Sequence, residues 1–341
     1  MTHRKNIIDR RLCVAPMMEW TDRHCRYFLR QVAPDALLFT EMVTAAALIH
    51  GNLDRLLDHD AAEAPLVLQL GDSQPDRLAR AVALAAPWTF AEINLNVGCP
   101  SDRVQSGKFG ACLMAEPELV ASCCRAMMDE TDVPVTVKCR IGIDDMDPQT
   151  GLDRFVDAVA DAGAQVIYLH ARKAWLNGLS PKENREIPPL DYGRAERLAR
   201  RRPDLDIILN GGLTDRDMTS AMLQPVGQIF AGVMLGRAAY KTPYQLGLFH
   251  QILHNKTAPI DLVDIALKMT DYAEQQIKTG VPLQAITRHM LGLCAGLKGA
   301  RAFRRELGEQ ARMPGADWTL IETALKACLR ENKNPDEKKV A

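Results

Sequence analysis

Short runs of apolar and β-branched residues recur along the chain as far as residue 236, and longer stretches of mixed polarity separate them. Short apolar runs that end at polar or turn-forming residues are typical of buried strands. Eight runs fit this description: CVAPM at 13–17, LLFT at 37–40, LVLQL at 66–70, INLN at 93–96, VTVKC at 135–139, VIYLH at 166–170, DIILN at 206–210 and GVMLG at 232–236. The pattern therefore predicts eight strands.

The stretches between these runs have the periodicity of amphipathic helices and begin with residues that favour a helix N-terminus. Four starts are clearest: Thr21-Asp22 before RHCRYFLRQV, Ser73-Gln74-Pro75 before DRLARAVALAA, Glu116-Pro117 before ELVASCCRAMM, and Thr214-Asp215 before RDMTSAML. Strand and helix thus alternate. Successive strands begin roughly 31 residues apart, which is a comfortable length for a βα unit.

Eight such units close most naturally into a (β/α)₈ barrel, the TIM barrel of the α/β class. The alternative is a doubly wound open sheet, which usually places a glycine-rich dinucleotide-binding turn after its first strand. The corresponding segment here, CVAPMMEW, contains no glycine. We therefore expect the barrel.

Beyond residue 255 the strand pattern ends and amphipathic helices follow. The helical segments are DLVDIALKMTDYAEQQIK, PLQAITRHMLGLCAGL, ARAFRRELGEQ and WTLIETALKACLREN. The predicted organisation is a barrel domain over residues 1–254, a small all-α domain over 255–330, and a flexible charged tail over 331–341.

Composition and charge narrow the class of protein. The chain has 341 residues, of which 47% are hydrophobic and 25% charged, with a net charge of −1, so a mainly disordered chain is excluded. No apolar run approaches the length of a membrane span, and the N-terminus lacks a secretory signal, so we expect a cytoplasmic protein without a membrane partner. Between Arg288 and Arg330, however, eight Lys and Arg face four Asp and Glu. A polyanionic partner would meet this part of the chain.

Cysteine usage gives no sign of a disulfide framework or of a metal site. The nine cysteines form no CxxC pair and no Cys/His cluster with the spacing of zinc ligands. We expect reduced thiols and no bound metal.

Residues that follow the seventh and eighth runs indicate a phosphate site. Barrels often bind phosphate after these two strands, where glycines allow backbone N–H groups to approach the phosphate oxygens. The residues in question are Asn210, Gly211, Gly212, Gly236 and Arg237, the last of which adds positive charge. Either glycine pair alone could equally serve a tight turn.

Lys138 and His170 close the fifth and sixth runs and should project into the barrel mouth, where catalytic groups of such barrels lie. A buried lysine needs an anion, a cofactor carbonyl or a covalent use to offset its desolvation. The alternatives are a lysine that reaches solvent from the strand end and a histidine that only packs.

Cys99 differs from the other cysteines in its setting. It lies in the polar loop NVGCPSDRVQSGKFGACLM, directly after the fourth run, whereas Cys123, Cys124 and Cys294 fall on apolar helical stripes. Most cysteines are buried hydrophobes, but a thiol at an active-site rim is a candidate acid or nucleophile. The residues alone leave that choice open.

Four cations share one face of a C-terminal helix, because Lys298, Arg301, Arg304 and Arg305 follow helical spacing. No acidic residue interrupts them before Glu306. Such a face is either solvated or binds the phosphate backbone of a nucleic acid.

Several segments together resemble one enzyme family. They are APMMEWTDRHCR, LNVGCPSDRVQSGKFGACLM, VKCRIGID, HARKAWLNGLSPKENREIPPL, LNGGL and GVMLGRAAY. The chain resembles the tRNA-dihydrouridine synthases, their A subfamily in particular, from about Arg11 to Arg305. The resemblance implies a flavin mononucleotide (FMN) barrel in which NADPH reduces the flavin and the C5=C6 bond of D-loop uridines in tRNA, at positions 20 and 20a, is reduced.

The resemblance also implies roles for single residues. Hydride would pass from the flavin to C6 of uracil, and Cys99 would donate a proton to C5. The cofactor-binding residues would be Pro16, Met17, Met18, Gln69, Lys138, His170, Asn210, Gly211, Gly212, Gly236 and Arg237. The residues in contact with tRNA would be Asn96, Lys182, Arg185, Arg301 and Arg304.

Three other functions remain open at this point. The first is an FMN barrel that reduces a small pyrimidine or ene-carbonyl compound. The second is a lyase that uses Lys138 as a Schiff base and needs no flavin. The third is a noncatalytic tRNA-folding protein, in which Cys99 has no chemical role.

Overall fold

The computed structural model describes residues 8–147, 149–214 and 229–333. The chain divides into two compact units, each formed by two separate segments. The first unit comprises residues up to Glu19 together with Ala36–Gly236, and the second comprises Trp20–Asp35 together with the chain from Arg237 onward. We describe each unit by itself.

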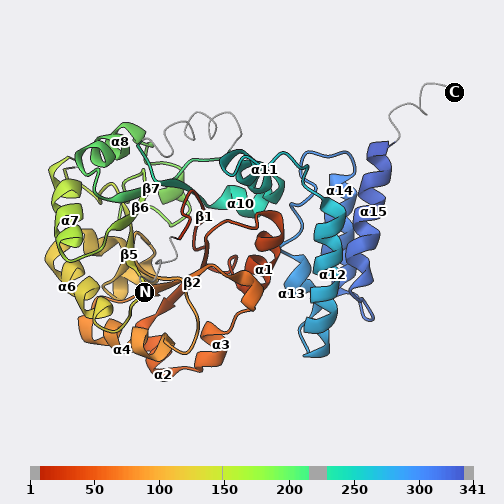
Figure 1. Cartoon of the computed structure of the whole chain (residues 1–341), viewed down its shortest axis with the longest axis horizontal. Coiled ribbons are helices and arrows are strands. Elements are labelled where there is room, and N and C mark those ends of the chain that lie inside the picture. The colour runs from red at the N-terminus through yellow and green to blue at the C-terminus, as the bar shows by residue number, and fades with distance from the viewer. Residues whose placement is uncertain (1–7, 148, 215–228, 334–341) are drawn as a thin grey trace, which may run out of the picture. The chain divides into compact units, whose positions relative to one another are not determined.

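Eight parallel strands form the centre of the first unit (Figure 1). Their order in the sheet is β1-β8-β7-β6-β5-β4-β3-β2. Residues Cys13 and Leu37 form an isolated parallel bridge between the two edges, and the Val14 N–H donates to the Leu37 carbonyl at 2.9 Å. The predicted barrel is therefore confirmed. The strands are β1 (Leu12–Val14), β2 (Leu38–Thr44), β3 (Leu66–Gly71), β4 (Glu92–Val97), β5 (Val135–Arg140), β6 (Val166–His170), β7 (Asp206–Asn210) and β8 (Gly232–Leu235).

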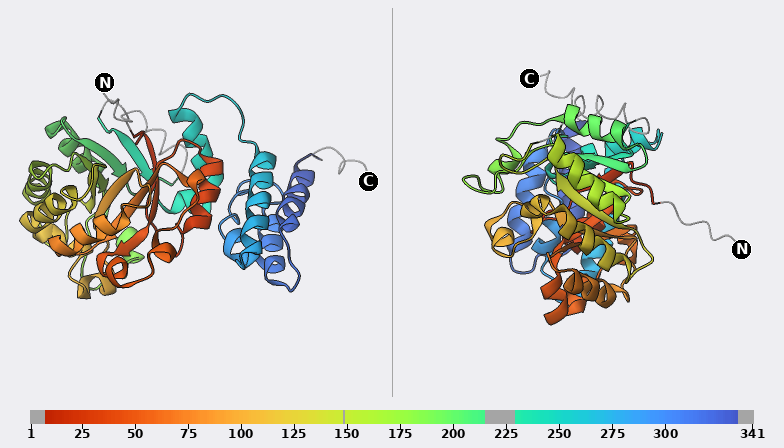
Figure 2. Two further views of the ribbon diagram at one scale, coloured as in Figure 1. Left: turned by 60° about the horizontal axis from the view of Figure 1, so that its bottom comes forward. Right: turned by 90° about the vertical axis from the view of Figure 1, so that its left-hand side faces the viewer.

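The outer layer of the first unit consists of helices between successive strands (Figures 1 and 2). The predicted helix start at Pro75 is confirmed, as is the one at Pro117, each with proline in the first turn. The start predicted at Thr214-Asp215 has its helical residues outside the described part of the chain. The helices are α2 (Ala45–His50), α3 (Leu53–Leu57), η1 (Ala61–Glu63), α4 (Pro75–Ala85), α5 (Asp102–Ser106), η2 (Gly110–Ala115), α6 (Pro117–Met128), α7 (Thr150–Asp161), η3 (Glu183–Arg185) and α8 (Tyr192–Arg201).

The barrel interior is a packed apolar core with one buried ion pair. Side chains from the inner face of the sheet form a cluster in which the rings of Phe39 and Tyr168 meet edge to face, with centroids 5.0 Å apart. Glu92 at the start of β4 is fully buried and pairs with Arg10, its Oε2 lying 2.6 Å from Arg10 Nη2. The hydroxyl of Tyr168 donates to the same carboxylate at 2.9 Å. The buried charge is thus paired and hydrogen-bonded, as burial requires.

Two strands differ from their predicted bounds by more than one residue at an end. β1 ends at Val14, so Pro16 and Met17 follow the strand instead of closing it. β2 continues to Thr44, well beyond the predicted end at residue 40, and its register with β3 shifts between Phe39 and Met42. The polar residues Thr40 and Glu41 broke the apolar pattern but remain in extended backbone.

Among its described residues, the second unit contains helices and no strand. Its elements are α1 (Arg23–Val32), α10 (Arg237–Lys241), α11 (Pro243–Leu253), α12 (Leu262–Lys278), α13 (Leu283–Thr287), α14 (Ala300–Glu309), η4 (Gln310–Arg312) and α15 (Thr319–Lys333). Asp22 caps α1 by accepting from the Cys25 N–H at 3.0 Å, which confirms the predicted start. The rings of Tyr27 and Tyr272 stack with centroids 3.8 Å apart and so join α1 to α12. Figure 2 shows α12, α14 and α15 side by side.

One predicted helix of this unit is wrong over most of its length. The pattern over 282–297 suggested a continuous helix, but α13 ends at Thr287 and hydrogen-bonded turns follow. Gly292 lies so close to the backbone of Lys241 that a Cβ would be 2.3 Å from its carbonyl oxygen, and Gly296 has φ of 91°. Close backbone approach and a left-handed residue replace helical geometry here. α15 extends to Lys333, into the predicted tail, and the rest of that tail lies outside the described residues.

The helices also answer the question of membrane spans for the part of the chain that the structure covers. Among residues 8–147, 149–214 and 229–333, no helix is long and apolar enough to cross a bilayer.

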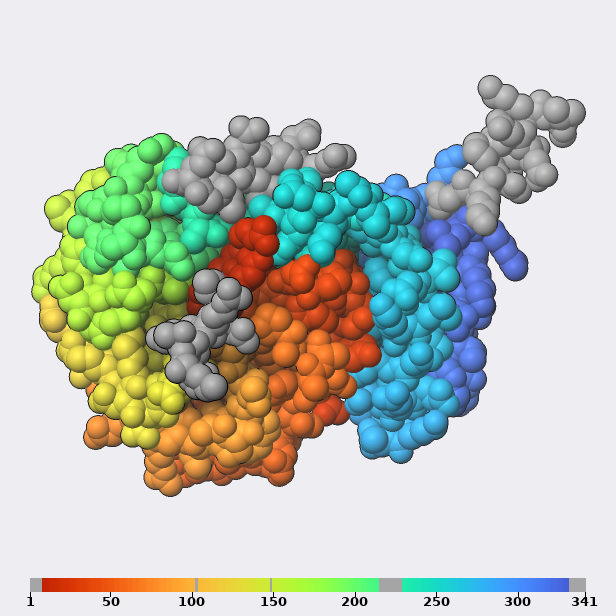
Figure 3. Space-filling view, in the orientation of Figure 1, coloured from red at the N-terminus to blue at the C-terminus, as the bar shows by residue number. Residues whose placement is uncertain are grey.

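In the space-filling view, the yellow and green segments that carry α6, α7 and α8 form an outer surface of the first unit (Figure 3).

Candidate active site

The carboxyl ends of the strands bring the predicted residues of the first unit to one rim of the barrel. Lys138 on β5 is in register with Asn96 on β4, and His170 on β6 is in register with Asn210 on β7. Gln69 lies on β3, one strand further along the sheet. Because all strands are parallel, these side chains belong to the same end of the barrel, where catalytic groups of this fold lie.

Lys138 is held at the rim by a neighbouring amide. Its Nζ donates to Asn210 Oδ1 at 3.1 Å, and Asn210 Nδ2 donates to the Met234 carbonyl at 2.7 Å. Burial and, after it, the nearby positive charge of Arg140 lower the pKa of the Lys138 amine to about 8. The amine donates to a neutral amide, and this position therefore favours an anionic group or a polarised carbonyl beside the amine.

His170 is a neutral imidazole at the same rim. Burial holds its pKa well below the ordinary value, and surrounding cations oppose a further positive charge: Arg140, Lys138, Arg172 and Arg185. The ring packs directly over Gly211, where an added Cβ would lie 2.3 Å from His170 Cδ2. A side chain at position 211 would therefore clash with the imidazole, which explains why this residue is glycine.

The predicted phosphate residues come directly after β7 and β8. Gly211 and Gly212 have φ of 106° and 70°, a backbone conformation that L side chains rarely adopt. At Gly236 an added Cβ would have only Ala15 Cβ as a neighbour, 4.0 Å away, so open space lies in front of this backbone. Arg237 follows Gly236 in sequence and begins α10 in the second unit. Gly236 thus leaves its backbone accessible to a ligand, whereas His170 covers Gly211, and Leu190 and Tyr192 cover Gly212.

Cys99 lies in the loop after β4, where Asn96 holds the backbone. Asn96 Oδ1 accepts from the N–H groups of Gly98 and Cys99, at 3.1 and 3.0 Å. The thiol is half-buried and lies 3.5 Å from the Ser101 hydroxyl oxygen. The backbone that carries the thiol is therefore fixed by a strand residue, while the sulfur keeps partial access to solvent.

Asn96 ends a chain of hydrogen bonds that crosses the barrel interior. Asn96 Nδ2 donates to Gln69 Oε1, Gln69 Nε2 donates to Asn94 Oδ1, and Asn94 Nδ2 donates to Thr136 Oγ1, at 2.8, 2.8 and 2.9 Å. The Thr136 hydroxyl donates in turn to Glu92 Oε1 at 2.7 Å. All five side chains are buried. The chain connects the loop of Cys99 to the buried carboxylate at the start of β4.

Cys112 is the other half-buried cysteine among the nine, and its environment differs. Its thiol donates to the Phe109 carbonyl at 3.1 Å, and burial raises its pKa. The remaining cysteines are buried, and burial raises the pKa of Cys123, Cys124 and Cys139 to about 12. Cys99 is thus the half-buried thiol that sits beside a hydroxyl in the loop after β4.

Arg140 joins the two loops that flank the rim, a role that the residue pattern did not predict. The side chain is 3% exposed, and its Nε donates to the Gly98 carbonyl at 2.9 Å. Its Nη1 donates to the carbonyls of Lys173 and Asn184, each at 3.0 Å. One guanidinium therefore fixes the loop after β4 and the loop after β6 together.

Asn184 organises the loop after β6, which carries two of the predicted tRNA-binding residues. Its amide donates to the carbonyls of Trp175 and Leu179 and accepts from the Trp175 N–H, at 2.8, 3.1 and 2.8 Å. Lys182 and Arg185 flank it and are exposed. A fully buried asparagine thus presents two cations at the surface of a shaped loop.

The residues after β1 complete the rim in sequence order. Pro16 and Met17 are half-buried, whereas Met18 is 57% exposed. An exposed methionine beside a polar rim offers apolar contact area to a planar ligand.

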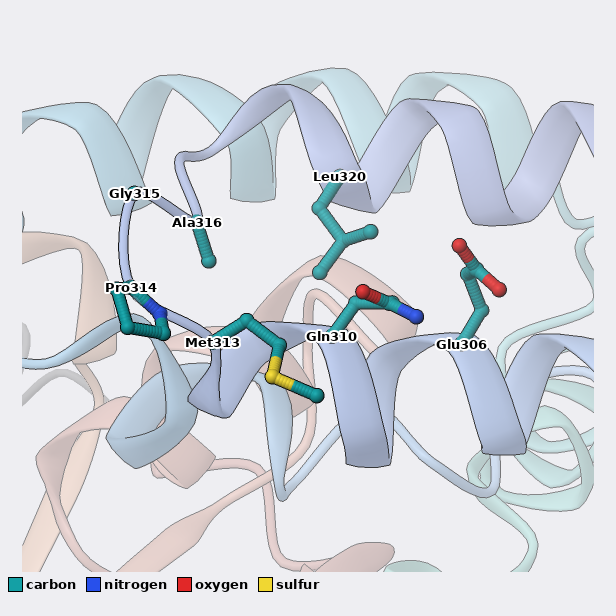
Figure 4. A pocket seen from close by; sticks show the side chains of 7 residues that line it. All are labelled: Glu306, Gln310, Met313, Pro314, Gly315, Ala316 and Leu320. Carbon is teal, nitrogen blue, oxygen red and sulfur yellow. The ribbon is translucent and has the colours of Figure 1, made fainter.

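The basic residues of α14 belong to the second unit. Arg301, Arg304 and Arg305 are exposed and line a hollow of about 770 Å³ together with residues of the preceding turns. The three arginines share α14 as predicted, but Lys298, which was predicted on the same helix, lies in the turn before it. A smaller hollow of about 280 Å³ lies between η4 and the start of α15 (Figure 4). Leu320 and Met313 face it, and none of its lining residues is a predicted site residue.

Comparison with known proteins identifies relatives of the chain. The family model described as dihydrouridine synthase (Dus) matches residues 13–330. A protein of Xanthomonas axonopodis pv. citri named tRNA-dihydrouridine(20/20a) synthase is 54% identical over 315 residues, covering 92% of this chain and 93% of that protein. Proteins of the same name from Shewanella oneidensis and Vibrio parahaemolyticus are each 51% identical, over 93% and 94% of this chain and 93% and 98% of theirs.

Proposed function

The chain belongs to the dihydrouridine synthase family, and from that premise we propose how its residues reduce uridines of tRNA at positions 20 and 20a. The enzyme is an oxidoreductase that acts on the C5=C6 bond of the base, and enzymes of this family depend on a flavin. The observation that carries the assignment of roles is the meeting of Lys138, His170 and the Cys99 loop at one rim of the barrel.

FMN is the flavin that we assign to this rim. Gly236 leaves backbone open to a phosphate, the turn of Gly211 and Gly212 would contribute backbone N–H groups beside it, and Arg237 would add charge. Lys138 and the neutral His170 would face the ring system, with Gln69, Asn210 and Pro16–Met18 lining it. When bound, the flavin, reduced by NADPH, supplies the hydride that C6 of uracil accepts.

Cys99 would supply the proton that completes the reduction. Hydride addition at C6 leaves negative charge at C5 and the C4 oxygen, so C5 must receive a proton from an acid within reach. The thiol is half-buried, and its backbone is fixed by Asn96. After the transfer, the thiolate would regain its proton from solvent. Asn96 would also contact the target nucleotide, because its side chain lies at the rim.

Binding of tRNA would use cations in both parts of the chain. Uridine in a folded RNA is stacked, so it must be extruded before it can reach a barrel mouth. We assign Lys182 and Arg185 of the first unit, and Arg301 and Arg304 of α14, to phosphates of the tRNA. We propose residues 255–330 as the tRNA-binding domain, since they carry the local excess of positive charge.

Mass-resolved mapping of dihydrouridine tests this proposal. Purified protein is incubated with unmodified tRNA and NADPH, and the product is located by nuclease digestion. Dihydrouridine at positions 20 and 20a is the expected result. A yellow, flavin-loaded protein that forms none, but reduces a free pyrimidine, would favour the small-molecule reductase. A preparation that contains no flavin and forms no dihydrouridine, but cleaves a carbonyl substrate, would favour the lyase that uses Lys138 as a Schiff base.

A further inference from the structure

Two histidines and one aspartate meet in the second unit, outside the site described above. His250 lies in the last turn of α11, His254 directly follows this helix, and Asp35 follows the C-terminal end of α1. Figure 1 shows α1 and α11 next to each other, and the two helices are in contact. Among the described residues, these three form the group of side chains whose ligand atoms all lie within 4.8 Å of one another.

The geometry is close to that of a metal site. His250 Nε2 lies 2.9 Å from Asp35 Oδ2, and His254 Nδ1 lies 3.9 Å from the same oxygen. Two ligands of a tetrahedral Zn²⁺, each about 2.1 Å from the ion, are about 3.4 Å apart. The observed separations lie on either side of that value, so small side-chain rotations would bring all three atoms to one ion.

The chain fixes the two imidazoles on one side. Residues four apart on a helix share a face, and the rings of His250 and His254 stack with centroids 4.7 Å apart. At Gly247, one turn earlier, α11 approaches α1 so closely that a Cβ would lie 3.2 Å from the Val32 carbonyl oxygen. The packing of the two helices therefore holds the aspartate segment near the histidine pair.

Burial and charge also suit a cation. The side chains of His250 and His254 are only 7% and 6% exposed, whereas that of Asp35 is 48% exposed. The Asp35 carboxylate is the anionic member of the group and lies against His250. A buried imidazole pair with an exposed carboxylate leaves a route for an ion from solvent and a coordination position for water.

We propose that Asp35, His250 and His254 bind one divalent transition-metal ion of the zinc type. Imidazole nitrogen is a ligand for Zn²⁺, Cu²⁺ or Ni²⁺, whereas Mg²⁺ and Ca²⁺ select oxygen, so the donor set excludes the latter two. Water completes the coordination. The ion braces the C-terminal ends of α1 and α11 against each other and takes no part in uridine reduction. The expectation of no metal rested on cysteine spacing, which cannot detect a His pair whose third ligand lies 215 residues away from His250.

Zinc binding by the full-length, chelator-treated protein tests this proposal. Zn²⁺ is titrated against a chromophoric chelator, and Co²⁺ is used as a spectroscopic probe, since four-coordinate Co²⁺ has strong visible bands. Wild-type protein should bind one equivalent and show these bands. Removal of groups that only orient a metal ligand weakens binding about 10- to 100-fold, so loss of a ligand in H254Q or D35N should cost at least that much.

The control variant is H50Q, which removes an exposed histidine at the end of α2. It should bind Zn²⁺ as the wild type does. D35N alters an exposed side chain and should leave the fold intact, which circular dichroism checks. Absence of saturable binding by the wild type, or wild-type affinity in both H254Q and D35N, would overturn the proposal. Added Zn²⁺ should also raise the unfolding temperature of the wild type but not of D35N.

Discussion

The side-chain oxygen of Asn96 lies 3.0 Å from the backbone nitrogen of Cys99 and accepts its hydrogen bond. Asn96 is a buried residue of β4, whereas Cys99 lies in the loop that follows. A strand of the barrel thus sets the position of the residue to which we assign proton transfer. This arrangement matches the demand that a catalytic group be held by rigid neighbours.

Replacing the Cys99 thiol should abolish most turnover without removing either ligand. In Cys99→Ala no acid would protonate C5, and a positioned general acid contributes typically about 10²- to 10⁴-fold. We expect the rate of dihydrouridine formation to fall by that factor, while flavin content and tRNA affinity stay at wild-type values. Cys112→Ala is the matched control, because Cys112 is also half-buried but its thiol bonds to the Phe109 carbonyl. A wild-type rate in Cys99→Ala would refute the proton-donor role.

Substitution of Arg140 should lower the stability of the protein and also displace the loops at the barrel rim. Arg140→Lys keeps the charge but cannot reach the carbonyls of Gly98, Lys173 and Asn184 at once. Buried carbonyls left without a donor cost about 1–3 kcal/mol each, so we expect unfolding free energy to fall by about 2–4 kcal/mol.

Denaturant unfolding measures this loss, and kinetics with tRNA should show a reduced kcat because the Cys99 loop is displaced. Arg125→Lys on the exposed surface of α6 serves as the control and should change neither quantity. Equal stability of Arg140→Lys and wild type would show that the two loops do not depend on this guanidinium.

Loss of the α14 cations should weaken tRNA binding because it removes part of the electrostatic contribution to the binding free energy. If Arg301 and Arg304 each neutralise a phosphate, their joint replacement by alanine reduces counterion release on binding. We expect weaker binding at low salt and a plot of log affinity against log salt that is shallower by about 1–2. Arg197→Ala, an exposed arginine of α8, should leave the slope unchanged. An unchanged slope in the double variant would instead indicate a merely solvated helix face.

The lowered pKa of Lys138 should appear as a pH-dependent stability of the flavin-free protein. Because its pKa falls from 10.5 to about 8 on folding, the unfolded chain holds more protons between these values. Stability contributed by this site therefore rises as pH increases from about 8 to 10.5, and the penalty of burying the charged amine is fully present below pH 8.

Unfolding free energies of wild type and Lys138→Met, compared across this range, measure the effect. The unfolding free energy of the wild type should increase relative to that of the variant as pH rises. Bound flavin should reduce the gain, since an anionic or carbonyl group beside the amine raises its pKa again. If the unfolding free energies of the two flavin-free proteins change in parallel with pH, the pKa of Lys138 is not lowered on folding.

The sequence predicted the barrel because its signal is local and repeated. Each strand is buried on both faces and so reads as a short apolar run, and each helix start depends on residues such as Asp22 that act on their own neighbours. The helix predicted over 282–297 was wrong because a contact distant in the sequence decides the backbone there. There the close approach of Gly292 to Lys241, which no periodicity records, decides the backbone.

The same distinction applies to the site. The positions of Lys138, His170 and Asn210 could be predicted because they lie at or near the carboxyl ends of parallel strands, and these ends share one rim. Arg140 could be located by the same rule but its role could not be predicted. Its partners are backbone carbonyls, which carry no residue-specific signal, in loops 42, 33 and 44 residues away.

The hydrogen-bond chain from Asn96 to Glu92 has a direction. Every donor in it points toward the carboxylate, and a carboxylate can only accept, so Glu92 dictates which way each amide along the chain is turned. Asn96 is left with its oxygen toward the Cys99 loop for this reason. A Glu92→Gln exchange, which offers both a donor and an acceptor, would permit the reversed sequence of amides and turn an NH₂ group toward N–H groups of that loop. The orientation of a catalytic loop is thereby encoded at the opposite end of the strand that leads to it.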